Sequence, residues 1–234
     1  MMPNALILWD IDHTLIETGG VGTEVFAAAF SAATGVALQE MPDPTGKLEP
    51  DTFMAACEAN GAVQSPQAFA RFEVAQAAEY RARAEDLMKR GRVLPGVTAI
   101  LAKLADNDDV AQAVLTGNTL AAAEAKLEAF GLQQYIDFAC SAGGTDAQSR
   151  PDLVAVTWER ARVHHQRTFG MTNTVIIGDT YADIETGHRN NCRVVAVATG
   201  VTGAEELTAA GADAVFQDLS DQEAVLEAIL GPLA

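Results

Sequence analysis

The chain has few cysteines, few basic residues and no long uninterrupted hydrophobic run. Its three cysteines, Cys57, Cys140 and Cys192, are far apart and form no CxxC pair, which argues against a disulfide framework and against a cysteine zinc site. No apolar run reaches the length that spans a bilayer, and no basic segment precedes the first apolar stretch. We therefore expect a cytoplasmic protein that does not enter a membrane.

The shortage of basic residues argues against nucleic acid and anionic membrane surfaces as partners. Lys and Arg total 15 against 32 Asp and Glu, which gives a formal net charge of −17. Nucleic acid and anionic membrane surfaces would repel such a protein, so neither is expected as a partner. The glycines of "GGVG" at 19–22 lack the third glycine of a dinucleotide loop, because position 25 is Val25, and no GxxxxGK[ST] loop occurs.

The apolar residues that are present form short runs rich in β-branched side chains, each closed by Gly, Asp or Thr. Near-continuous apolar runs of this length are typical of parallel strands covered on both faces. Helical patterns alternate with these runs from about residue 93 onward, whereas 17–92 hold Ala-rich helical patterns and no convincing strand. The runs are "ALILW", "VAQAVLTG", "NTVIIGD" and "RVVAVATG".

The predicted fold is a doubly wound, Rossmann-like α/β core with a parallel sheet and an inserted α-helical subdomain. The core comprises 1–16 and 93–234, and the insertion comprises 17–92. Open α/β sheets bind ligands at the carboxyl edge of the strands, so the insertion is expected to act as a cap over that edge.

Carboxylates follow two of the predicted strands. Asp10 and Asp12 end the first run and share one side of it, because successive strand residues alternate faces. Asp179 ends the "TVIIGD" run, and Asp183 follows four residues later. Acidic groups that converge on one edge repel each other unless a cation neutralises them, and oxygen ligands of this kind suit Mg²⁺. One carboxylate could then attack phosphorus while its neighbour transfers the proton.

Two other strand ends offer groups that can hold a phosphate. "VLTGN" presents the hydroxyl of Thr116 and the backbone amides of Gly117 and Asn118 at a strand-to-helix junction. "SRPDLV" presents Arg150, whose guanidinium can pair with a phosphate or with the nucleophile.

In this order, these motifs resemble those of the haloacid dehalogenase-like hydrolase superfamily, and most of all its phosphoglycolate phosphatase-like members with a helical cap. The resemblance covers the whole chain, with the insertion between the first and second motifs. It implies that Asp10 is the nucleophile and a metal ligand, and that Asp12 is the general acid and base and offers its backbone carbonyl to Mg²⁺. It also implies phosphoryl binding by Thr116, Gly117, Asn118 and Arg150, and metal binding by Asp179 and Asp183.

The chain departs from the family pattern at two positions. His13 stands where Gly is common, and Arg150 stands where the third motif usually has Lys. Lys47, within the insertion, could reach the far end of a substrate. His164 and His165 lie in a polar helical stretch, where surface positions are expected, and they lack the spacing of a metal-binding pair.

The function expected from these features is Mg²⁺-dependent hydrolysis of a small phosphorylated metabolite through an aspartyl-phosphate. The Asp12 carboxylate favours phosphate esters, because the dehalogenases and phosphonate-cleaving members of the superfamily lack it. Two alternatives stay open: a phosphomutase of the β-phosphoglucomutase type, and a non-catalytic sensor of a phosphorylated ligand. The natural substrate and the choice between monomer and homodimer are left undetermined.

Overall fold

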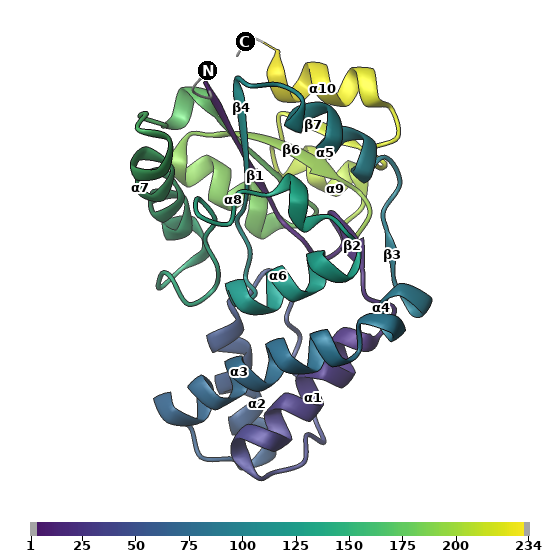
Figure 1. Ribbon diagram of the computed structural model, residues 1–234, viewed down its shortest axis with the longest axis vertical. Coiled ribbons are helices and arrows are strands. Elements are labelled where there is room, and N and C mark those ends of the chain that lie inside the picture. The colour runs from purple at the N-terminus through teal and green to yellow at the C-terminus, as the bar shows by residue number, and fades with distance from the viewer. Residues whose placement is uncertain (1–3, 232–234) are drawn as a thin grey trace.

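The computed structural model describes residues 4–231, and its centre is one parallel sheet (Figure 1). The sheet has five strands in the order β4-β1-β5-β6-β7. Strands β1, β4, β5 and β6 were predicted from the sequence. Strand β7 was not, because it is three residues long and only partly buried and so leaves little signal. The strands are β1 (Ala5–Trp9), β4 (Val110–Val114), β5 (Thr174–Gly178), β6 (Arg193–Val197) and β7 (Ala214–Phe216).

Helices cover both faces of the sheet. Strand β1 shows the reason for its apolar run, because Ile7 and Trp9 pack into one hydrophobic cluster while Leu6 and Leu8 pack into another. Side chains from α5 (Val97–Ala105), α6 (Leu120–Ala129) and α10 (Gln222–Leu230) join the first cluster. The opposite face is covered by α7 (Leu153–His165), α8 (Tyr181–Asn190) and α9 (Ala204–Ala209). The predicted doubly wound α/β fold is confirmed.

Four helices that precede β3 (Arg92–Val93) lie beside the sheet (Figure 1): α1 (Val21–Thr34), α2 (Glu49–Asn60), α3 (Pro66–Ala82) and α4 (Ala84–Arg90). Helices α1, α2 and α3 pack around an apolar centre of their own, and α4 packs with α1, α3 and α6 in a second cluster. The first centre is built mainly from Phe26, Phe30, Phe53 and Phe72, and the rings of Phe53 and Phe72 are 4.9 Å apart. We call the four helices the cap helices.

Two short connections join the cap helices to the sheet. β2 (Ile16–Glu17) and β3 (Arg92–Val93) pair antiparallel, and the Arg92 guanidinium lies 2.8 Å from the Glu17 carboxylate. Two-residue strands are too short for hydrophobic periodicity to reveal, so the sequence did not predict them.

The cap helices lie close against the loops at the carboxyl ends of the strands. The backbone N–H of Glu49, at the start of α2, donates to the carbonyl of Gly117 at 2.8 Å. A side chain at Gly117 would place its Cβ 2.1 Å from the Lys47 carbonyl oxygen, so only glycine allows this approach. The contact encloses the space between the cap helices and the sheet.

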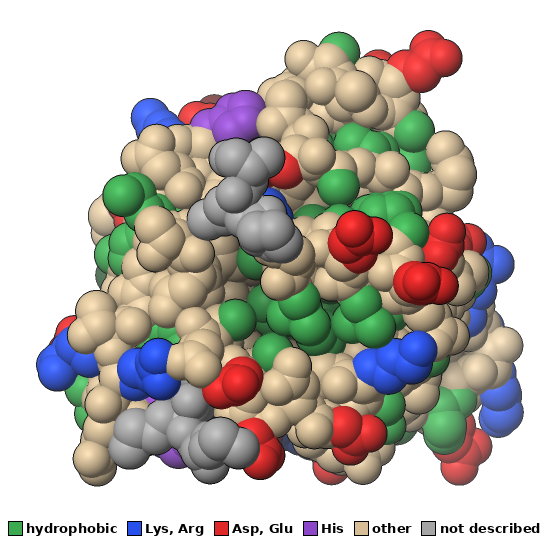
Figure 2. Space-filling view, turned by 90° about the horizontal axis from the view of Figure 1, so that it is seen from above, with side chains coloured by type: hydrophobic (Ala, Val, Ile, Leu, Met, Phe, Trp, Pro, Cys, Tyr) green, Lys and Arg blue, Asp and Glu red, His purple; other side chains and the backbone are tan. Residues whose placement is uncertain are grey.

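Two observations concern the outside of the molecule. Within 4–231, no helix combines the length and the apolarity needed to cross a membrane. Figure 2 looks onto the end of the molecule away from the cap helices, where acidic and basic side chains are interspersed among the described residues without a continuous basic patch.

Candidate active site

A cavity of about 260 Å³ lies between the carboxyl edge of the sheet and the cap helices. The core side of its wall includes Asp10, Asp12, Thr116 and Asp179, which follow strands far apart in the sequence, and Arg150, which follows a loop rather than the strand expected from the sequence. The cap side includes polar residues of α2 and α3. The structure therefore brings together, at one edge, groups that the sequence predicted there.

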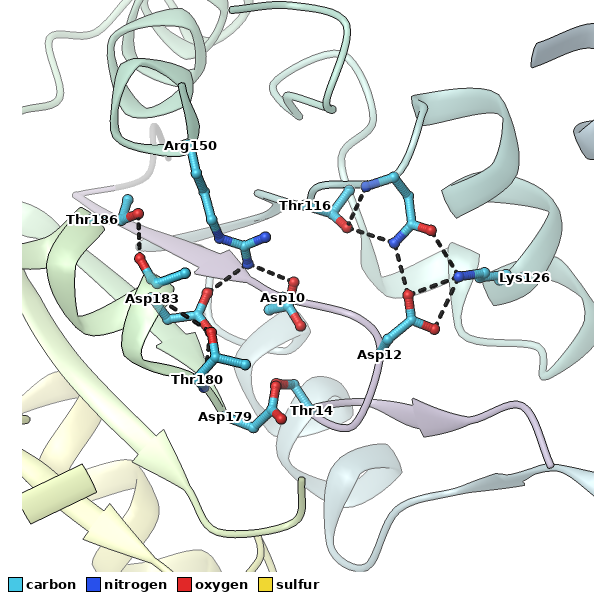
Figure 3. Close-up of polar contacts among 12 residues, drawn as sticks. Asp10, Asp12, Thr14, Thr116, Lys126, Arg150, Asp179, Thr180, Asp183 and Thr186 are labelled. Atoms are coloured by element: carbon cyan, nitrogen blue, oxygen red, sulfur yellow. Dashed lines mark hydrogen bonds and ion pairs between the residues drawn. The ribbon is translucent and has the colours of Figure 1, made fainter. Parts of the chain in front are cut away.

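Arg150 and the acidic residues form the first of two polar groups in this cavity (Figure 3). Arg150 begins a 3-10 turn, Arg150–Asp152, and its Nη2 donates to Asp10 at 2.6 Å and to Asp183 at 2.5 Å. Asp179 follows β5 and accepts a hydrogen bond of 3.2 Å from the Thr14 hydroxyl. All three acidic side chains are buried.

The position of Asp183 is fixed by the start of α8. Its carboxylate accepts from the backbone N–H of Thr180 at 3.1 Å, and the Thr180 hydroxyl oxygen accepts from the backbone N–H of Asp183 at 3.4 Å, which is a reciprocal helix cap. Gly178 leaves room for it, because a Cβ there would lie 2.1 Å from Asp183 Cγ. Gly200 leaves room for Asp179 in the same way, with a Cβ position only 1.8 Å from its Oδ2.

In this group three carboxyl groups face the single positive charge of Arg150. Burial raises the pKa of Asp10 to about 7, although Arg150 opposes the rise, and burial with two neighbouring carboxylates raises the pKa of Asp179 to about 8. Asp10, Asp179 and Asp183 can each direct one oxygen to a common point, since these atoms lie within 4.8 Å of one another. An all-oxygen set of buried carboxylates fits a hard divalent cation such as Mg²⁺.

Asp12 and Lys126 form the second polar group, on the other side of Asp10 in Figure 3. Lys126 Nζ donates to both oxygens of Asp12, at 2.9 and 2.7 Å, and to Asn118 Oδ1 at 2.7 Å. The Asn118 amide donates to Asp12 at 2.8 Å. Burial would raise the pKa of Asp12, but the charge and hydrogen bonds of Lys126 and the bond from Asn118 lower it below its ordinary value.

Lys126 is a residue of this site that the sequence analysis missed, as it missed Glu49 and Gln76 on the cap side. It is 3% exposed and lies on α6, and its ammonium is 5.1 Å from the ring centre of Tyr80 of α3. A signal was present, because Lys126 is one helical turn from Ala122 and Ala123 on the apolar side of "LAAAEAKLEAF". A lysine at a core-facing position is costly unless it is paired.

Thr116, His13 and Lys47 also lie at the cavity wall. Thr116 is fully buried, and its hydroxyl oxygen accepts from the Asn118 side chain at 2.8 Å. His13 has φ of 62°, the left-handed region that glycine adopts most easily, which explains why this position is commonly glycine in the family. His13 and Lys47 are both exposed at the cavity wall.

Fold and site together define an α/β protein that gathers carboxylates at the carboxyl edge of a parallel sheet, beneath a helical insertion. The family model described as haloacid dehalogenase-like hydrolase matches residues 7–197. The chain belongs to this family and is a hydrolytic enzyme, so the resemblance inferred from the motifs is confirmed.

Solved structures share the fold at low sequence identity. A protein described as a predicted phosphatase from Clostridium acetobutylicum is 20% identical with a TM-score of 0.69, over 96% of this chain and 99% of that one. CbbY from Rhodobacter sphaeroides in complex with phosphate is 20% identical with a TM-score of 0.71, over 94% and 96%. A predicted phosphoglycolate phosphatase from Haemophilus somnus 129pt is 16% identical with a TM-score of 0.65, over 97% and 99%. No curated protein matches the chain.

Proposed function

We propose that the protein is a Mg²⁺-dependent phosphatase that hydrolyses a small phosphate monoester through phosphorylated Asp10. The observation that carries the proposal is the convergence of two distinct carboxylates on one small cavity. Asp10 is buried beside Arg150 and two further carboxylates, whereas Asp12 is held by Lys126 and Asn118. The first is suited to covalent attack and the second to proton transfer. The complex of CbbY with phosphate supports a phosphoryl ligand for this fold.

The reaction proceeds in two halves. Asp10 attacks phosphorus, the bond to the leaving oxygen breaks, and the leaving oxygen takes a proton from Asp12. Water then attacks the phosphorylated Asp10, Asp12 accepts the proton of that water, and Asp10 is regenerated as inorganic phosphate leaves. Arg150, at 2.6 Å from Asp10, lies beside the transferred phosphoryl oxygens, and Thr116 with the Gly117 and Asn118 amides binds them from the end of β4.

Lys126 belongs to the machinery of proton transfer as a positioning residue. Its ammonium stabilises the ionised form of Asp12, which is the form that accepts a proton from water in the second half. It also fixes the direction of the carboxylate through two hydrogen bonds.

Asp10, Asp179 and Asp183 would hold Mg²⁺, with the backbone carbonyl of Asp12 as a further ligand. When bound, the ion offsets the negative charge of the carboxylates and of the phosphate.

The cap helices close the cavity and select the substrate. At about 260 Å³ the cavity is smaller than drug-sized pockets of roughly 300–1,000 Å³, so the substrate is a metabolite of a few carbons. On its cap side, Gln76 Nε2 donates to Glu49 at 2.8 Å, and the buried Gln76 Oε1 finds no hydrogen-bond partner among the described residues. These acceptor oxygens favour a substrate that carries a hydroxyl at this end. A substrate with a carboxylate there would be repelled by the Glu49 charge.

Phosphate release from a panel of small monoesters, with and without Mg²⁺, tests the proposal. The wild type should release phosphate only with the metal, and Asp10→Asn should release none while keeping its fold by circular dichroism. Glycerol phosphate should be preferred to phosphoglycolate. Full activity of Asp10→Asn would refute the mechanism, and turnover of a phosphosugar without phosphate release would favour a phosphomutase.

A further inference from the structure

Two histidines and an aspartate converge at the far end of α7, away from the cavity. His164 and His165 are the last two residues of α7, and Asp137 lies after the 3-10 turn Gln133–Tyr135. Helix α7 starts three residues after Arg150 and has 13 residues, so its far end lies on the order of 20 Å from Arg150 at 1.5 Å per residue. The cluster is therefore separate from the active site.

Asp137 is held in place by the sheet. Its backbone N–H donates to the carbonyl of Gln112 in β4 at 2.7 Å, and its Oδ1 accepts from the backbone N–H of Ala139 at 3.0 Å. These bonds leave Oδ2 facing α7, where it lies 3.2 Å from Nε2 of His164 and 3.2 Å from Nε2 of His165. The Cys140 thiol also donates to this oxygen at 3.4 Å.

The directions of the imidazoles differ from those of an ordinary hydrogen-bonded pair. Neighbouring residues on a helix point about 100° apart, yet both Nε2 atoms reach the same carboxylate oxygen. His165 Nε2 is buried and finds no hydrogen-bond partner among the described residues, although it is only 3.2 Å from Asp137 Oδ2. The nitrogen is therefore close to the oxygen without pointing at it.

Ligands of one metal ion have this arrangement. With metal bonds of about 2.0–2.1 Å, two ligand atoms of a tetrahedral site are about 3.3 Å apart, and each points at the ion between them. The two nitrogen–oxygen distances of 3.2 Å agree with that separation. One ligand atom from each of the three residues lies within 4.8 Å of the others.

We propose that Asp137, His164 and His165 form a binding site for a divalent transition metal of the Zn²⁺ class. Imidazole ligands favour Zn²⁺, Ni²⁺ or Cu²⁺, whereas Mg²⁺ prefers oxygen ligands, so Mg²⁺ is not expected to compete for this site. A metal there links the end of α7 to the segment after α6. His164 and Asp137 are 27 residues apart in the sequence. Its effect is on stability, because the catalytic groups lie at the other end of α7.

Calorimetric titration of chelator-treated protein with Zn²⁺ tests this site, with Mg²⁺ in excess to occupy the acidic cluster. We expect one equivalent to bind the wild type and to raise the midpoint of thermal unfolding by a few degrees. His164→Ala should lose that equivalent and the thermal shift, and its side chain is half exposed, so the fold should be kept. The His164→Ala/His165→Ala double variant should behave in the same way.

His188→Ala is the matched control, because His188 is also exposed but lies on α8 outside the cluster. This variant should bind Zn²⁺ as the wild type does. The proposal is overturned if the wild type binds no Zn²⁺, or if the cluster variants bind it as tightly as His188→Ala. These readouts do not depend on turnover, so they are independent of the proposed phosphatase activity.

Discussion

Replacing Lys126 with methionine should impair proton transfer while leaving the covalent step available. The substitution keeps the side-chain volume and removes two hydrogen bonds to Asp12, at 2.9 and 2.7 Å. Hydrogen bonds to charged groups contribute about 1.5–3 kcal/mol each, but the Asp12 side chain is 37% exposed, so water replaces part of the loss. Taking about 1.5–3 kcal/mol for the pair, kcat/KM should fall roughly 10- to 150-fold.

The dependence of the rate on pH gives the more specific result. Without Lys126, Asp12 loses the charge and the hydrogen bonds that lower its pKa, so this pKa rises and less of Asp12 is ionised at a given pH. The acidic limb of the kcat profile should therefore move to higher pH in Lys126→Met and return toward the wild-type position in Lys126→Arg. Lys103→Met, at an exposed position of α5, is the control and should change neither quantity. A wild-type rate and pH profile in Lys126→Met would refute the reasoning.

Three further results are expected. Because burial raises the folded-state pKa of Asp10 to about 7 and of Asp179 to about 8, the chelated protein should lose stability as pH rises through these values. Mg²⁺ should therefore raise the thermal midpoint more at pH 8 than at pH 6, and an equal effect at both would count against the acidic cluster as its site. Arg150→Lys should lower kcat/KM by roughly 10-fold or more through loss of one charge-assisted bond, and unchanged kinetics would remove Arg150 from the site. Gly178→Ala should destabilise the fold by about 1–3 kcal/mol in urea unfolding, whereas Gly170→Ala, where a Cβ meets nothing within 4 Å, should not.

Much of the fold could be read from the sequence because strands covered on both faces must be apolar throughout. Four of the five strands carry this local signature, helix α6 shows apolar residues at helical spacing, and the family follows from motifs at the strand ends. Strand β7 and the β2–β3 pair could not be predicted, because two or three residues show no periodicity.

The sequence also determined which acidic residues follow strands, since the position of Asp10 after β1 and Asp179 after β5 is a local property of the chain. Only the tertiary structure decided which partners these carboxylates meet. Lys126 lies 114 residues from Asp12, and Arg150 lies 140 residues from Asp10, so their pairing depends on how α6 and α7 pack on the sheet. The same holds for His164, which sequence spacing alone placed on the surface without a metal partner. Asp137 faces it because β4 fixes the Asp137 backbone, and no local pattern records that contact.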